Sequence, residues 1–162
     1  MVMVWQFEGV LTLLAALGCG LVAGVFFTFS TFVMQALFRL PAHEGIAAMQ
    51  SINIVVLNPW FLGTFFGTGA ICVLLIVLAL VSEAGFSAAF GVLGSALYLV
   101  GTLGVTIVCN VPRNQALAKL DPKAPDSVAH WDDYVRNWTR WNHVRTIAAL
   151  LAAAVFSVML AV

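Results

Sequence analysis

The sequence predicts an all-α protein, a four-helix transmembrane bundle with short amphipathic segments at the membrane interface. Two observations carry this prediction. The 162-residue chain is 62% hydrophobic and only 9% charged, whereas soluble domains have roughly 45–50% apolar and about 25% charged residues. Its apolar residues also form four continuous runs, which is typical of membrane-spanning helices and unlike the alternating strands of a membrane barrel.

Each apolar run is long enough to cross a bilayer, because a helix of about 20 apolar residues spans about 30 Å of hydrocarbon. The predicted spans are residues 9–38, 59–81, 86–111 and 143–162. The longer loops between them, at one end of the bundle, are residues 39–57 and 112–142. We therefore expect one integral membrane domain over residues 1–162.

The basic residues predict the orientation of this bundle. All seven Lys and Arg side chains lie in or next to the two longer loops, whereas the termini and the short second loop carry only Glu8 and Glu83. The positive-inside rule places the basic loops in the cytoplasm. We therefore expect a multi-pass cell-membrane protein whose N- and C-termini lie outside.

Glycine pairs within the spans predict close contacts between helices. Glycine allows backbones to approach where the hydrophobic effect cannot drive helix association. The pairs are Gly20 with Gly24 in the first span, Gly63 with Gly67 in the second, and Gly94 with Gly101 in the third. Each pair is spaced so that both of its members share one helical face.

The first basic loop contains an amphipathic segment and the start of the second span. Pro41 begins the segment, in which Ile46, Met49 and Asn53 lie on one helical stripe. We expect this segment to lie along the membrane interface or to cap the bundle. At its end, Asn58 is followed by proline, a pair typical of a helix start.

The third span closes with the sequence Asn110-Val-Pro-Arg-Asn114. Pro112 has no backbone donor and disfavours helix at the residue before it, so we expect the chain to kink or stop here and to leave carbonyl groups free. Asn110 and Asn114 either bond to these carbonyls or direct their amide hydrogens at a ligand. The sequence favours neither interpretation.

A helix is expected to begin at Asp126 or Ser127 and to run without a break into the last span. Aromatic and polar side chains share one of its faces. They are Tyr134, Trp138, Trp141 and Arg145, with Trp131 at the start of the stripe and Asn142 beside it. One interpretation is an aromatic belt at the membrane interface, with the arginine reaching the lipid headgroups. The other is a functional site, because an ionisable residue at the edge of a span marks function by default.

Motifs from all parts of the chain point to a known family. They are Phe26-Phe-Thr-Phe-Ser30 with Val33-Met34, Met49-Gln50 through Asn53, Asn58-Pro59, Asn110-Val-Pro-Arg-Asn114 and Trp138-Thr-Arg-Trp-Asn-His-Val-Arg-Thr146. In this combination the chain resembles the anthrone-oxygenase-like small membrane proteins. The resemblance implies an oxygenase-like enzyme that oxidises an anthrone to a quinone, with molecular oxygen as co-substrate and without a cofactor.

Residues near the same end of the bundle suit this chemistry, in which an anthrone loses a proton and its anion reacts with oxygen. His143 is the expected base, because an imidazole accepts a proton at neutral pH, and Arg145 is expected to stabilise the oxyanion. The expected substrate-binding residues are Asn58, Asn110, Asn114, Trp138, Trp141 and Asn142. His143 and Arg145 lie about 200° apart around a helix, so they line one pocket only if it wraps the helix.

Two alternatives stay open. A metal or haem centre is the less favoured one, because His43, His130 and His143 are the only histidines and none pairs at helical ligand spacing, so no metal ligand is predicted. The other is a non-enzymatic membrane protein that binds an apolar ligand or joins a larger complex. The expected partners are the lipid bilayer and a small apolar aromatic ligand, and a net charge of zero excludes a polybasic nucleic-acid surface.

Overall fold

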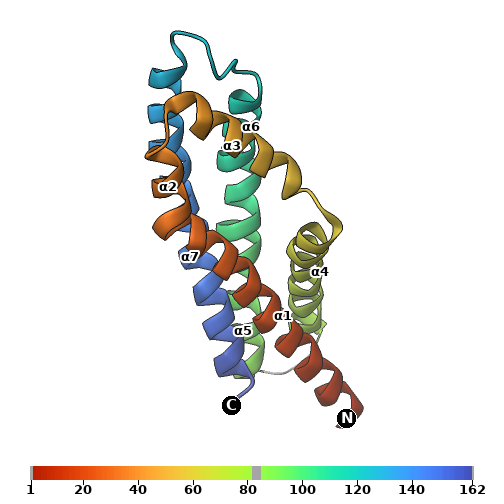
Figure 1. Cartoon of the computed structure of the whole chain (residues 1–162). Helices are drawn as coiled ribbons and strands as arrows, with labels where there is room; N and C mark the ends of the chain where they lie inside the picture. The colour runs from red at the N-terminus through yellow and green to blue at the C-terminus, as the bar shows by residue number, and fades with distance from the viewer. Residues whose placement is uncertain (1, 82–84, 162) are drawn as a thin grey trace.

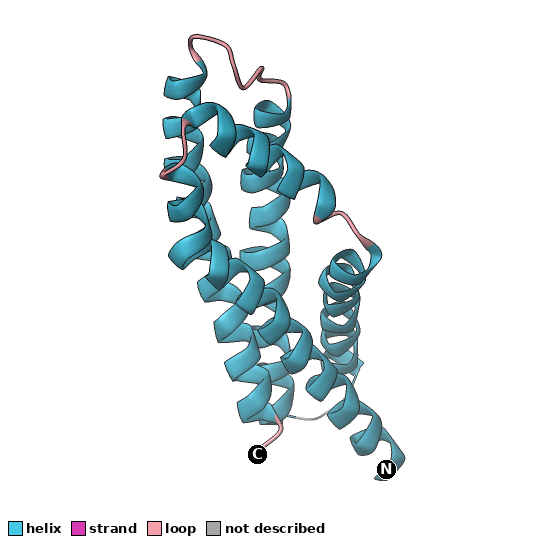
Figure 2. Cartoon of the chain, viewed as in Figure 1, coloured by secondary structure: helices cyan, strands magenta, loops and turns pink. Residues whose placement is uncertain are grey.

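The chain folds into a bundle of helices, as the sequence predicts (Figure 1, Figure 2). The computed structural model describes residues 2–81 and 85–161, and no strand occurs among these residues. The helices of the first half are α1 (Val2–Thr28), η1 (Phe29–Val33), α2 (Met34–Phe38), α3 (Ala42–Val55) and α4 (Pro59–Val81). Those of the second half are α5 (Gly85–Ala96), η2 (Leu97–Gly104), η3 (Thr106–Asn110), α6 (Val111–Ala118) and α7 (Ser127–Met159). The segments named η are π-helical.

Four continuous helical stretches are long and apolar enough to cross a membrane. They are Gln6–Phe38, Pro59–Val81, Ser87–Ala118 and Ser127–Met159. Both termini lie at one end of the bundle, and α3 and the loop after α6 lie at the other (Figure 1). The chain is therefore a multi-pass membrane protein. Glu83, the acidic residue of the short second loop, lies outside the described residues.

The third helix does not end at Pro112, where a kink or stop was expected. It continues as α6, and the proline occupies the first turn of α6, where a missing backbone donor costs least. The wider π-helical turns of η3 come directly before it, so the ring of Pro112 does not follow a regular α-helical turn. The predicted loop 112–142 is consequently helical except at residues 119–126. As predicted, α7 runs unbroken from Ser127 into the last apolar segment.

The predicted amphipathic segment is α3, which crosses the loop end of the bundle (Figure 1). Its stripe points inward, since Ile46 and Met49 are fully buried against Trp131 and Leu117. These side chains belong to a second hydrophobic cluster, separate from the one between the spans. α3 therefore caps the bundle, and the apolar side chains beneath it hold it there.

Close helix contacts occur at only one of the three predicted glycine pairs. A Cβ at Gly101 would lie 2.5 Å from the Cβ of Ala148, and one at Gly94 would lie 2.8 Å from the ring of Phe156, so η2 and α5 approach α7 closely. The prediction is wrong for the other two pairs. A Cβ would meet nothing within 4 Å at Gly20, Gly24, Gly63 or Gly67, because these positions face outward.

We expect Gly101→Ala to destabilise the protein by about 1–3 kcal/mol, because the new methyl group would push η2 away from α7. Gly67→Ala is the matched control, since its methyl group enters open space and alanine favours helix. Thermal unfolding in detergent is the measurement. Equal melting temperatures for the two variants would contradict the close contact.

Candidate functional site

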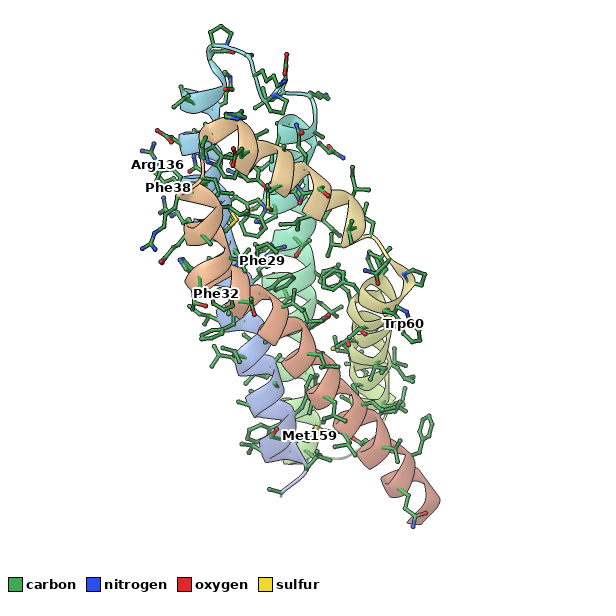
Figure 3. All side chains as sticks on the ribbon, in the orientation of Figure 1. Phe29, Phe32, Phe38, Trp60, Arg136 and Met159 are labelled. Atoms are coloured by element: carbon green, nitrogen blue, oxygen red, sulfur yellow. The ribbon has the colours of Figure 1, made fainter. Side chains whose placement is uncertain are left out.

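A cavity of about 170 Å³ lies beneath α3, where α1, α4, α6 and α7 meet. Its walls are mainly aromatic and aliphatic, and the principal side chains are Phe26, Phe29, Met49, Phe61, Phe65 and Trp138. Phe29, which is labelled in Figure 3, lies between the helices, in the half of the bundle nearer to α3. A flat apolar molecule fits such walls, because aromatic rings pack in offset-stacked or edge-to-face contacts.

The single charged side chain in the lining of this cavity is Arg145. It is 5% exposed, and its guanidinium carbon lies 3.9 Å from the ring centroid of Phe26 and 4.9 Å from that of Trp138. Within the described residues, the ion pairs that form involve His43 and His130 at the surface, and none involves Arg145. The cation is therefore held by ring faces and neutral dipoles, without a carboxylate.

With the end of α7 taken as the boundary of the hydrocarbon layer on the side of the termini, Arg145 lies within that layer. It precedes Met159, the last residue of α7, by 14 residues, which is about 21 Å of helix at about 1.5 Å per residue. The hydrocarbon layer is about 30 Å thick. A cation at such a depth is costly, and it normally faces the interior of a bundle and marks a ligand or ion site.

Asn142 positions the arginine. Its Oδ1 accepts a hydrogen bond from Nε of Arg145 at 2.9 Å, which the three-residue spacing on α7 allows. Its Nδ2 donates to the carbonyl oxygen of Phe26 at 2.7 Å and to Oγ of Ser30 at 2.6 Å. A second contact comes from η3, where Oγ1 of Thr106 accepts from Nη1 of Arg145 at 3.3 Å. Three segments distant in sequence therefore meet at one guanidinium.

The asparagines near the end of the third membrane-spanning stretch bind to α7. Oδ1 of Asn114 accepts hydrogen bonds from Nε1 of Trp138 at 2.7 Å and from the hydroxyl of Tyr134 at 3.0 Å. Nδ2 of Asn110 donates to the carbonyl oxygen of Trp138 at 3.2 Å, and the residue is fully buried. Asn114 lines the cavity, whereas Asn110 does not. Both therefore brace the helix that carries Arg145.

The aromatic stripe of α7 is part of the folded interior and not a lipid-facing belt. Trp131, Tyr134 and Trp138 are all buried, and their rings stack in sequence with centroids 5.7 Å and 6.3 Å apart. The stripe packs against α3 and α6. The belt interpretation is therefore wrong for these three residues.

Five of the predicted site residues do not line the cavity. Two of them, Asn110 and Asn142, make the hydrogen bonds described above, and the other three are His143, Asn58 and Trp141. His143 is exposed and lines a separate outer groove between α2 and α7, so it does not share a pocket with Arg145. Asn58 caps α4 instead, since its Oδ1 accepts from the backbone N–H groups of Trp60 at 3.1 Å and Phe61 at 3.0 Å. Trp141 is half-buried and does not line the cavity.

Sequence analysis missed two polar residues of the cavity lining. Asn53 of α3 and Thr106 of η3 both line it. The pattern placed Asn53 on the same stripe as Ile46 and Met49, but nothing in it indicated that this stripe would cover a cavity. Thr106 lies within a long apolar run and had no distinguishing pattern. Among the described residues, no group of three or more His, Cys, Asp or Glu side chains is placed to hold a metal ion.

We expect Asn142→Ala to lower the free energy of unfolding by about 1–3 kcal/mol, because it removes three buried hydrogen bonds and leaves Nε of Arg145 unpaired. Asn137→Ala is the matched control on the same helix, because the side chain of Asn137 donates hydrogen bonds to Asp133, one turn earlier on α7. Unfolding in detergent measures both variants. If they unfold together, Asn142 does not tie α1 to α7.

The chain was compared with known proteins. The family model described as anthrone oxygenase matches residues 60–155, a segment that covers more than half of the chain and contains Asn110, Asn114, Trp138, Asn142 and Arg145. Neither the search of the curated proteins nor the search of the solved structures found a match. The family match agrees with the resemblance that the sequence motifs carry, and the chain belongs to the anthrone oxygenase family.

Proposed function

We propose that the protein is a membrane-embedded, oxygenase-like enzyme that acts with O₂ on a planar, apolar, aromatic substrate at the cavity beneath α3. The observation that carries the proposal is Arg145, a cation at hydrocarbon depth that faces an aromatic cavity without a carboxylate beside it. A buried cation without a partner is unfavourable, and the oxygen of a ligand that develops negative charge would supply the missing partner.

The chemistry suits an anthrone-type substrate. Loss of a proton from its methylene gives an anion whose charge is shared with the ketone oxygen, and Arg145 would stabilise that oxygen. The anion transfers electrons to O₂ and forms a hydroperoxide at the former methylene carbon. Loss of water from the hydroperoxide gives the quinone, so that one anthrone and one O₂ yield one quinone and one water. The proposal includes no cofactor, and metal analysis with an absorption spectrum of the purified protein tests that part.

From its position, Arg145 would stabilise the negative charge that develops on a substrate oxygen in the cavity. The lining contains neither a carboxylate nor an imidazole, so the substrate proton would pass to water at the cavity mouth. The sequence-based proposal that His143 is the base is the competing one. His143 is exposed on another face of α7 and would need a proton path around the helix.

We expect Arg145→Gln to lower the rate of quinone formation by about 10²–10³-fold, because removal of one preorganised oxyanion partner typically costs this much. The rate of Arg145→Lys should fall between those of the wild type and Arg145→Gln, since lysine keeps the charge but loses the forked donor geometry. The assay follows quinone absorbance from an anthrone with and without oxygen. Lys123→Gln in the exposed loop is the control, and turnover by Arg145→Gln at the wild-type rate would refute the proposal.

His143→Ala in the same assay separates the two proposals for proton removal. Turnover should persist if the proton leaves through the cavity mouth. A loss as large as that of Arg145→Gln would instead support His143 as the base.

A non-enzymatic protein that binds an apolar ligand is the second candidate. The absence of a carboxylate or imidazole from the cavity lining is the observation in its favour. Planar aromatic ligands should then quench the fluorescence of Trp138 while no oxygen-dependent turnover occurs with any anthrone, hydroquinone or other phenol tested. The wild-type protein alone distinguishes this candidate from the enzyme.

We also propose that the loop end of the bundle faces the cytoplasm and that both termini lie outside. The support is the positive-inside rule together with the elements that lie at the end opposite the termini, α3 and the loop after α6 (Figure 1). The basic residues near or within these elements are Arg39, Arg113, Lys119 and Lys123. In a background without the native cysteines, an impermeant maleimide should label Ala161→Cys in intact cells and Lys123→Cys only after lysis. The reverse pattern would overturn the orientation.

A further inference from the structure

A second hollow lies on the outer face of the bundle, where α2 runs beside α7. This outer groove has a volume of about 380 Å³. Arg136 and Arg140 line it from α7, and Met34, Phe38 and Val135 supply apolar surface. Arg136 and Phe38 lie on the same side of the molecule in Figure 3. The groove therefore combines two cations with an apolar floor, and it shares no lining residue with the cavity of Arg145.

The two guanidinium groups of the groove are unpaired. Both side chains are exposed, and among the described residues neither forms an ion pair or a hydrogen bond. Asp132 lies one turn before Arg136 on α7, but no ion pair forms between them. Thr139 also lines the groove, and its buried hydroxyl oxygen has no hydrogen-bond partner. The groove thus offers several unused donors and no acidic group in its lining.

With Met159 again taken as the boundary on the side of the termini, the groove lies at the depth of the lipid headgroups on the loop side. Arg140 precedes Met159 by 19 residues, which corresponds to about 28 Å along α7. Because the hydrocarbon layer is about 30 Å thick, Arg140 reaches the boundary on the loop side of the membrane. Arg136 lies one further turn out, and Arg145 lies more than one turn in. The same helix therefore carries one arginine for the interior and two for the membrane surface.

We propose that the outer groove binds the phosphate headgroup of an anionic phospholipid. The two guanidinium groups lie four residues apart on one helical face, and each can make two parallel hydrogen bonds to phosphate oxygens. An acyl chain would pack against the exposed ring of Phe38. Basic residues at this level attract anionic lipids, most strongly in the cytoplasmic leaflet. The proposal does not depend on oxygenase activity.

The test measures lipid affinity of the full-length protein by native mass spectrometry from mixed micelles. Phosphatidylglycerol should bind more tightly than phosphatidylcholine. The double variant Arg136→Gln with Arg140→Gln should weaken phosphatidylglycerol binding by about thirtyfold, since each basic side chain near the surface contributes about a fivefold factor. Lys119→Gln with Lys123→Gln removes the same charge from the adjacent loop and should leave the affinity within about twofold.

Two results would overturn the proposal. If the lysine double variant weakens binding as much as the arginine double variant, the attraction is a diffuse effect of net charge and not a property of the groove. If glycerol phosphate at the same concentration displaces the lipid completely, the site recognises a soluble phosphate and the apolar floor contributes nothing. Wild-type preference with loss only in the arginine double variant supports the lipid site.

Discussion

The buried guanidinium of Arg145 is the main constraint on how the helices meet in the half of the bundle nearer to α3. A cation at hydrocarbon depth is unfavourable unless dipoles and ring faces surround it. Asn142 supplies one acceptor and Thr106 another, while Phe26 and Trp138 supply ring faces. Because these groups come from three helices, α1, η3 and α7 must meet where the arginine lies. The aromatic cavity is the space that remains in front of it.

The cap formed by α3 determines how this cavity meets its surroundings. α3 packs on a hydrophobic cluster that it shares with α2, α6 and α7, built around Trp131 and Met49, so the ends of these helices hold it over the bundle. Met49 and Asn53 of α3 line the cavity directly. The cap therefore limits access of water to Arg145, which strengthens the electrostatic effect of the cation on anything bound there.

Properties that follow from the chain's own polarity and periodicity were predictable. The four apolar helices, the buried stripe of α3 and the unbroken α7 all appear as expected. The predictions that were wrong concern what surrounds a residue in the folded chain. A kink or stop was expected at Pro112, but π-helical turns precede the proline and the helix continues past it as α6. Gly20 and Gly63 were expected at helix contacts, yet both face outward. Helical spacing shows which residues share a face, but not which face meets a neighbour.

The sequence alone determined that this chain crosses the membrane, that its polar side chains gather toward one end, and that it resembles anthrone oxygenases, because hydropathy and motif spacing are local properties. Only the tertiary structure decided how the polar set divides. Arg145 turns inward and His143, about 200° around the helix, turns outward, and the hydrogen bond from Asn142 to α1 is one of the contacts that fix this rotation of α7. Such a bond joins residues more than a hundred positions apart, and no local pattern encodes it.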